Sequence, residues 1–410
     1  MAMPQTSLTT FNLHRDIVDS ISSERFHAFI KEKNLVRQSG YSKQERVAII
    51  EDAINVKQIA LDDFEGFLSN ELMRNRNKTI FYSKISFDIS RRLKSLQYVQ
   101  SCLLEANMEE NNFNNILKSI QPDKKTCCYL DIQLNSSTEV SKIKLCFAES
   151  VVVGKATPNT LPRKETDFTW LELDLQRNLI TIRVFDRNAN FGGSTDKAKY
   201  QFCISQLKSI FNIRDLQDVS YQRSTLYKMF NELLSTAEEP FKRKVASVTT
   251  DTSKLVGAII EGLCLTNTLV IDDLNKRHNN LLIRSLIQEN FQQYSSYSEG
   301  KKGLVDRYYY TDNTGASVNA KTNDDQRSIS LYDIYLDTKH SIDNLKKVEK
   351  LWITWYRKIT NRFGEKIIKV RTKIEVFKEC YVIHFLYEHL TEEAEIHVLS
   401  EFEFFERLSD

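Results

Sequence analysis

The chain is poor in the residue that most often interrupts regular structure. Its 410 residues include five prolines, two of which lie in the single stretch 154–167, and none follows Pro240. Proline breaks helices and the central strands of sheets. We therefore expect the part of the chain beyond Pro240 to form regular helices and strands with few forced turns.

Paired cysteine motifs are also missing. The seven cysteines include no C-x-x-C pair, and several lie in apolar runs such as KLCF and GLCL. This pattern is typical of reduced, buried thiols and argues against a disulfide framework or a paired-cysteine zinc site. The first residues, MAMPQTSLTTF, lack a basic segment followed by an apolar one. Together these features predict a cytosolic, cytoplasmic protein.

The chain has no large excess of one charge and no long apolar run. Its formal net charge is +2, so any attraction to a polyanion must come from local clusters of charge. The most apolar long stretch, 255–271, is interrupted by Glu261 and Asn267. A spanning helix needs about 20 mostly apolar residues. We therefore expect 255–271 to be buried inside the protein, and we expect no membrane partner.

Recognisable catalytic and cofactor motifs are absent. The Gly154-Lys155 pair lacks the preceding glycine of a phosphate-binding loop, and Gly192-Gly193 lacks the third glycine of a dinucleotide turn. Neither H-E-x-x-H nor G-x-S-x-G occurs. The sequence therefore predicts no cofactor, no metal and no identifiable catalytic residue, which favours a protein that is not an enzyme.

One fragment keeps a nuclease among the hypotheses. Glu299, Gly300 and Lys301 match the E-x-K triplet of metal-dependent nucleases, in which carboxylates hold the cation and lysine stabilises the developing charge. The triplet lies in a loop-like stretch, and no acidic strand end precedes it at short range. A second arrangement would use Asp186 with distant carboxylates. A nuclease with dispersed carboxylates is therefore an alternative rather than the leading hypothesis.

Hydrophobic periodicity predicts an α+β fold: a helical N-terminal region followed by two domains with antiparallel sheets and packed helices. Residues 1–122 are mainly helical in pattern, and Ser42 with Glu45 forms a capping box. Period-two strands begin near residue 127 and are followed by helices, giving an α+β middle domain over 123–247. Residues 248–410 complete the chain as an α+β C-terminal domain with a basic strand and an acidic terminal helix.

Two hairpins are expected. In the first, a turn at Arg177-Asn178 would place Leu173 opposite Ile182 and Glu172 opposite Arg183. In the second, a turn at Lys378-Glu379 would pair Ile374 with Ile383, and Lys373 with His384. Between them, the pattern of apolar residues over 341–356 predicts a helix with Trp352 and Trp355 on one side.

The stretch KIIKVRTKI, residues 366–374, carries the most suggestive surface. Alternation puts Lys369, Arg371 and Lys373 on one face and apolar side chains on the other. From Trp352 to Lys378 there are eight lysines and arginines against two glutamates. Cations that follow phosphates and aromatic rings that stack on bases are the two elements of nucleic-acid binding. The expected nucleic-acid-binding residues are Lys369, Arg371, Lys373, Arg362, Arg357, Lys358, Tyr308 and Tyr309.

The last 23 residues limit this interpretation. Residues 388–410 hold eight acidic groups and one arginine in a helical pattern. An acidic helix beside the basic strand would neutralise it internally or cover it until nucleic acid displaces it, because charge runs are usually solvent-facing or paired.

The leading hypothesis is a non-catalytic nucleic-acid-binding protein, DNA or RNA, in a bacterial or mobile-element system such as phage defence. Residue usage rich in Asn, Lys and Ile suggests that source. The alternative is a protein–protein interaction scaffold, and a protein partner is expected in either case.

Overall fold

The computed structural model describes residues 10–35, 40–74, 78–108, 125–153, 163–185, 195–235, 238–296, 302–323, 327–361, 364–386 and 390–408. The fold is α+β, with helices at the N-terminus and antiparallel pairing between the strands. Contacts divide the chain into two compact units. Unit 1 is Met1–Asp218 with Glu388–Glu392, and unit 2 is Val219–Tyr387 with Glu393–Asp410. None of the described helices is long and apolar enough to cross a membrane.

These units do not follow boundaries at 122 and 247. Strand β1 (Thr79–Lys84) belongs to the N-terminal region but pairs with β5 (Leu179–Val184) along its whole length, from Thr79 opposite Val184 to Lys84 opposite Leu179. Strand pairing of this kind joins the N-terminal helices and the middle region into one unit.

Unit 1 begins with helices whose ends are set by local capping. Ser42 accepts a hydrogen bond from the backbone N–H of Glu45, whose carboxylate accepts one from the backbone N–H of Ser42, so the predicted capping box is confirmed. The described helices are α1 (Arg15–Ser20), α2 (Ser23–Glu32), α3 (Lys43–Asn55), α4 (Leu61–Arg74), α5 (Phe87–Leu93), α6 (Leu96–Glu105) and α8 (Asp196–Phe211).

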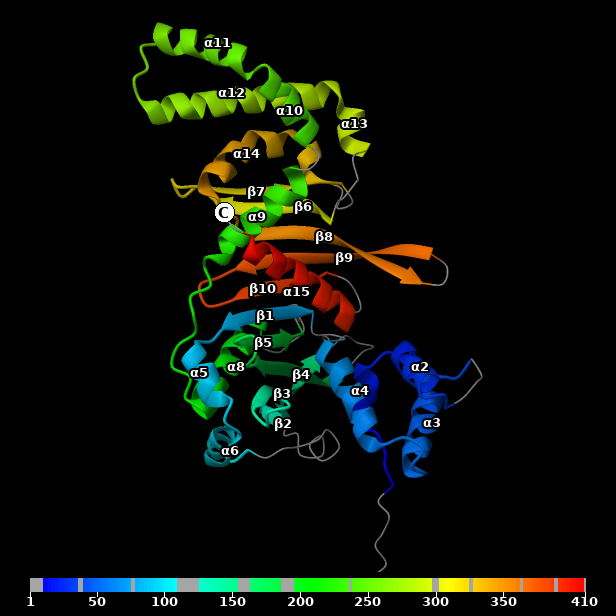
Figure 1. The fold of residues 1–410 in the computed structure, drawn as a ribbon. Coiled ribbons are helices and arrows are strands. Elements are labelled where there is room, and N and C mark those ends of the chain that lie inside the picture. The colour runs from blue at the N-terminus through cyan, green and yellow to red at the C-terminus, as the bar shows by residue number, and fades with distance from the viewer. Residues whose placement is uncertain are drawn as a thin grey trace, which may run out of the picture. The chain divides into compact units, whose positions relative to one another are not determined.

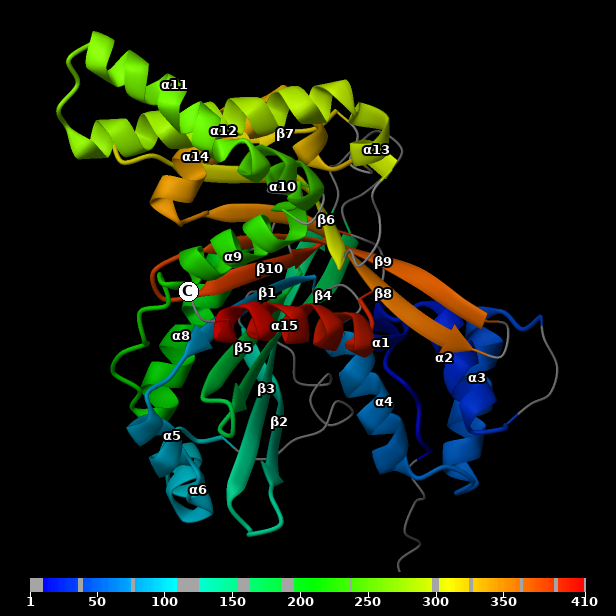
Figure 2. The same ribbon diagram turned by 45° about the horizontal axis from the view of Figure 1, so that its top comes forward.

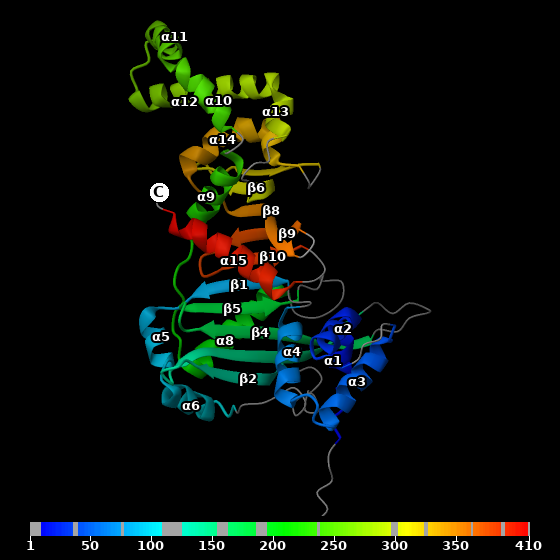
Figure 3. The ribbon, with the colours of Figure 1, turned by 45° about the vertical axis from the view of Figure 1, so that its right-hand side comes forward.

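The sheet of unit 1 has helices on both faces. Its strand order is β2 (Thr126–Leu134), β3 (Val140–Val153), β4 (Arg163–Asp174), β5 and β1. Helix α4 crosses one face (Figure 3), where Phe64 and Leu68 share a core cluster with Trp170. On the other face, Phe81 stacks on Tyr200 of α8. Burial on both faces explains why five of the six residues of β1 are buried.

The β4–β5 hairpin forms, but its register differs from the prediction. Leu173 pairs with Ile180, and Glu172 pairs with Thr181. The turn spans residues 175–178 instead of two residues. The Asp174 carboxylate accepts hydrogen bonds from two backbone N–H groups of this turn, and Asn178 adopts a left-handed conformation with φ of 54°. The shift is an even number of residues, so the aliphatic face stays aliphatic.

Unit 2 holds the second set of strands and most of the C-terminal helices. Its strand order is β10 (Tyr381–Phe385), β9 (Gly364–Val376), β8 (Lys350–Asn361), β6 (Gly303–Thr311) and β7 (Ser317–Lys321). Its helices are α9 (Gln222–Ser235), α10 (Glu239–Ser247), α11 (Thr249–Gly262), α12 (Thr268–Glu289), α13 (Phe291–Ser296), η3 (Ile329–Leu331), α14 (Asp333–Leu345) and α15 (Glu392–Arg407).

The β9–β10 hairpin confirms the predicted pairing. Ile374 lies opposite Ile383, and Lys373 lies opposite His384. The alternation of apolar and charged residues fixes this register, because a slip of one residue would move the apolar side chains to the charged face.

The helix predicted over 341–356 is wrong. Helix α14 ends at Leu345, Lys346 takes a left-handed conformation with φ of 51°, and β8 begins at Lys350. The segment LWITWY is rich in aromatic and β-branched residues, which favour a pleated strand over a helix. Trp352 and Trp355 therefore lie on opposite faces of the sheet, and only Trp355 is fully buried.

Candidate nucleic-acid interface

The two faces of the unit 2 sheet differ in what covers them. Helices α9 and α15 lie over strands β8 to β10 on one face (Figure 1). Phe230 of α9 packs edge-on against Tyr308, and Phe402 of α15 stacks on Tyr381 at 4.4 Å between ring centroids. We call this the helix face. Successive side chains of a strand point to opposite faces of the sheet, so the strand residues next to Tyr308 and Tyr381 point away from the helix face.

That other side is the basic face. Its members follow from strand register. They are Arg307, Tyr309, Lys321, Lys350, Trp352, Tyr356, Lys358, Lys369, Arg371, Lys373 and His384. Against these cations stand three carboxylates from the same strands, those of Asp306, Glu365 and Glu375. The basic face therefore combines an excess of positive charge with three partly exposed aromatic rings.

At its centre, one residue from each of the five strands lies in a single line. The pairs Lys321–Arg307, Arg307–Trp352, Trp352–Lys373 and Lys373–His384 are directly opposed in successive strand pairs. We call these five residues the cross-strand row. Adjacent strands lie about 4.8 Å apart, so the row places four basic side chains and one indole across roughly 20 Å.

Trp352 is the centre of this row. The Arg307 guanidinium carbon lies 4.2 Å from the Trp352 ring centroid, and the Lys373 ammonium lies 5.4 Å from it. A second such contact joins Lys350 and the Tyr309 ring at 5.4 Å. Cations held over aromatic rings keep their charge while losing side-chain freedom, so the positive groups are positioned before any ligand arrives.

Glu375 is the main internal counter-charge. Its carboxylate forms ion pairs with Lys373, with Lys350 at 3.0 Å and with His384 at 3.4 Å. Burial by itself would raise the pKa of Glu375, but the hydrogen bonds from these three groups outweigh burial and hold the pKa well below its usual range. Glu375 therefore stays ionised at neutral pH and anchors one end of the row.

Arg371 is also held by a carboxylate, whereas the Lys369 side chain is exposed. An Arg371 guanidinium nitrogen donates to Asp306 at 2.9 Å, and the Asp306 side chain is only 3% exposed. Asp306 lies at an irregularity in the β6–β8 register, which aims its carboxylate at β9. Lys369, Lys358 and Lys321 are exposed and are the cations best placed to reach a ligand.

Two of the residues predicted to bind nucleic acid lie on the helix face and not on the basic face. Tyr308 is fully buried on the helix face, where its hydroxyl lies 3.4 Å from the Ile334 carbonyl. Arg357 shares that face, because its neighbour Lys358 takes the basic face and consecutive side chains alternate. Tyr309 is partly exposed on the basic face, and Arg362 lies outside the described residues.

The acidic terminal helix contacts other residues. Glu401 of α15 pairs with Lys302 at 3.2 Å, and Glu406 accepts hydrogen bonds from Tyr221 and Gln222. Since Phe402 stacks on Tyr381, α15 packs on the helix face, opposite Lys373 and His384. Glu375 and Asp306, which pair with Lys350, Lys373, His384 and Arg371 on the basic face, both belong to strands of the sheet.

The predicted binding residues leave out six members of this face: Arg307, Lys321, Lys350, Trp352, Tyr356 and His384. Trp352 and Lys350 were assigned to a helix, which hid their alternation with Leu351 and Ile353. Arg307 and Lys321 come from strands distant in sequence, so their place beside Trp352 depends on strand order. The aromatic and β-branched content of 351–356 was the signal that identifies the strand.

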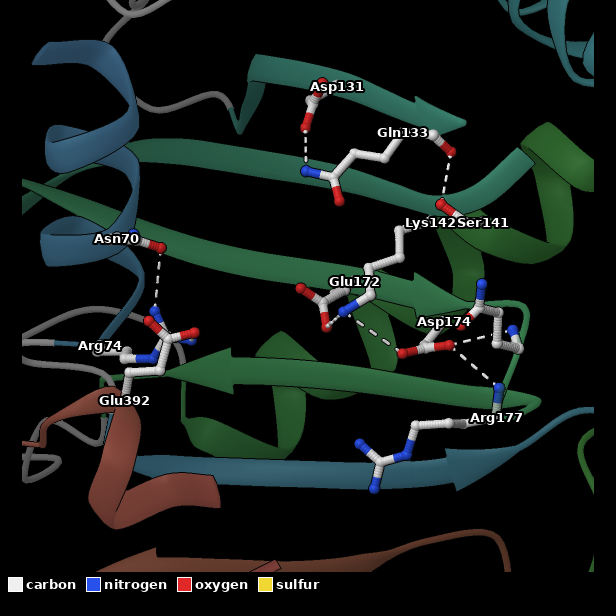
Figure 4. Close-up of polar contacts among 11 residues, drawn as sticks. Asn70, Arg74, Asp131, Gln133, Ser141, Lys142, Glu172, Asp174, Arg177 and Glu392 are labelled. Atoms are coloured by element: carbon white, nitrogen blue, oxygen red, sulfur yellow. Dashed lines mark hydrogen bonds and ion pairs between the residues drawn. The ribbon is translucent and has the colours of Figure 1, made fainter. Parts of the chain in front are cut away.

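Unit 1 carries a second charged array, which is balanced (Figure 4). Lys142 lies 3.4 Å from Asp174 and 3.9 Å from Glu172, and Arg74 pairs with Glu392 at 3.1 Å. Burial would raise the pKa of Glu172, but Arg183 and Lys142 lower it below its usual range. Lys142 and Arg74 are thus both paired with carboxylates, which leaves less positive charge to attract a polyanion.

Metal-dependent chemistry gains no support from the described residues. No group of three or more His, Cys, Asp or Glu side chains among them is arranged to hold a metal ion. Both Asp186 and the triplet Glu299 to Lys301 lie outside the described residues. Comparison of the chain with models of known protein families and with curated proteins finds no match.

Proposed function

We propose that this protein binds nucleic acid through the basic face of unit 2, without catalysing a reaction on it. The observation that carries the proposal is the cross-strand row, in which Lys321, Arg307, Lys373 and His384 flank Trp352. Lys369 and Lys358 extend the positive charge along β9 and β8. Phosphates would be bound by the exposed lysines, and a base would stack beside Trp352 or Tyr309.

Single-stranded nucleic acid suits this surface best. A sheet with partly exposed aromatic rings offers a platform for unstacked bases, and stacking contributes about 1–3 kcal/mol per base. The bases of a duplex are already stacked on one another and would present only phosphates to the sheet. Both DNA and RNA single strands have these features, so the proposal covers either.

The test compares two charge-matched double variants. Lys321→Glu/Lys369→Glu changes the basic face, whereas Lys276→Glu/Lys347→Glu changes exposed lysines of α12 and of the segment after α14. Fluorescence anisotropy with labelled single-stranded DNA, single-stranded RNA and duplex would be measured over a salt series. We expect the first variant to lose at least about tenfold in affinity and to show a salt slope smaller by about 2.

A spectroscopic readout accompanies the titration. The chain has three tryptophans, and Trp170 and Trp355 are fully buried while Trp352 is partly exposed. Bound nucleic acid should therefore quench the Trp352 contribution, and Trp352→Leu should remove the quenching. Equal affinity of the two double variants, or quenching that survives Trp352→Leu, would overturn the proposal.

A further inference from the structure

Helix α11 of unit 2 exposes several apolar side chains. The stretch 255–271 was expected to be buried, and its first residues lie in α11. Leu255 is nevertheless 56% exposed, and Ile259 is 43% exposed. Leu263, at the end of the helix, is 65% exposed. Helix α11 runs beside α12 (Figure 2), and Val256 of α11 is buried. The expectation of burial is wrong within this chain.

An apolar stripe of this kind normally has a partner. Leu255, Ala258, Ile259 and Gly262 follow the spacing of one helix face, and all four are exposed. Burying such side chains is worth about 25 cal/mol for each Å² of apolar surface removed from water. An exposed stripe therefore favours association with another surface.

The stripe is complementary to itself when two copies run antiparallel. A two-fold axis between residues 258 and 259 places Leu255 of one copy opposite Gly262 of the other, and Ala258 opposite Ile259. Each large side chain thus meets a small one. A Cβ added at Gly262 would have no atom of its own chain within 4 Å, so the space that Leu255 would fill is open.

The charged residues beside the stripe fit the same antiparallel, two-fold arrangement. Lys254 and Glu261 are seven residues apart, so they lie on the same flank of α11, two turns from each other. In the antiparallel arrangement, Lys254 of one copy lies near Glu261 of the other, and the same pairing occurs again across the axis. In two parallel copies this flank would meet the opposite flank of the other helix, so Lys254 and Glu261 would not pair with each other.

We propose that a second copy of this chain docks on α11, forming an antiparallel, two-fold symmetric helix pair. The contact uses one short helix from each copy, so its area is at the low end for specific interfaces. We therefore expect a weak dimer, with a dissociation constant in the micromolar range. This inference is independent of the proposed nucleic-acid binding, which uses the sheet.

The experiment uses site-specific cross-linking in the full chain. Cys264 is exposed, so it is first replaced by Ser. In that background, Ala258→Cys places a thiol beside its symmetry mate, whereas Ser253→Cys places an exposed thiol about 140° around the helix axis. Under mild oxidation, Ala258→Cys should form a disulfide-linked dimer and Ser253→Cys should remain largely monomeric.

Sedimentation supplies the second readout. The wild type should show concentration-dependent dimerisation below about 100 µM, and Ile259→Glu should be monomeric with an unchanged melting temperature. The proposal is overturned by a wild type that stays monomeric, by a dimer that persists in Ile259→Glu, or by equal cross-linking of the two cysteine variants. Binding of α11 to lipid vesicles by a monomeric wild type would assign the stripe to a membrane surface instead.

Discussion

At the scale of single residues, ion pairs separate the cations of the basic face that are held by carboxylates from the cations that are exposed. Glu375 holds Lys373, Lys350 and His384, and Asp306 holds Arg371. Replacing a buried carboxylate that serves several cations leaves those cations close together without compensation. We therefore expect Glu375 to serve stability, and we propose Lys369 and Lys321 as the residues that contact a ligand.

Glu375 should contribute to the pH dependence of folding. Its pKa is lowered in the folded protein, so its contribution is fully present above the ordinary carboxyl pKa and is lost as the pH falls toward the folded value. We expect Glu375→Gln to lower the free energy of unfolding at pH 7 by about 1–3 kcal/mol. The loss should shrink as the pH falls below about 4.

Urea denaturation at a series of pH values measures this effect. Glu365→Gln, an exposed position on the same strand, serves as the matched control. Parallel stability curves for the wild type and Glu375→Gln would contradict the assignment.

At the scale of secondary-structure elements, the end of α14 fixes the position of Trp352. Lys346 adopts a left-handed conformation and its backbone N–H bonds the Ile342 carbonyl, so the helix stops and β8 starts four residues later. A helix continued through 356 would have turned Trp352 and Trp355 to one side. The turn at Lys346 therefore allows Trp352 to join the cross-strand row.

Replacing Lys346 by glycine should stabilise the protein. A non-glycine residue in the left-handed region costs about 1 kcal/mol, and glycine avoids most of that cost. We expect Lys346→Gly to raise the free energy of unfolding by about 0.5–1 kcal/mol, measured by thermal denaturation. Lys347→Gly, at an exposed position whose φ is not positive, should have no stabilising effect. A lower melting temperature for Lys346→Gly would contradict this account.

At the scale of the whole molecule, charge segregation matters more than net charge. The chain is nearly neutral, yet basic side chains gather on one face of the unit 2 sheet while the acidic α15 packs on the other face. Screening in physiological salt acts over about 8 Å, so α15 should have little effect on a ligand of the kind proposed for the basic face.

Neutralising α15 should therefore leave nucleic-acid affinity almost unchanged. We expect Glu393→Gln/Glu403→Gln to alter the affinity less than about twofold at physiological salt. The control Glu24→Gln/Glu32→Gln removes the same charge from unit 1. A gain of about tenfold or more in the first variant alone would show that the acidic helix masks the basic face.

Much of the local structure could be predicted from the sequence, because it depends on neighbours along the chain. The capping box at Ser42 and the β9–β10 register were both predicted correctly, and Lys369, Arg371 and Lys373 were correctly placed on one face. The β4–β5 hairpin was recognised, but its register required the turn that Asp174 and Asn178 form.

The sequence by itself determined the α+β class, the alternation of the basic strand and the absence of known catalytic motifs, since these follow from residue type and short-range period. Only the tertiary structure decided that Trp352 lies between Arg307 and Lys373, that Tyr308 is buried, and that α11 exposes its apolar stripe. Each of these depends on which distant segments pack together, and residue spacing does not encode that choice.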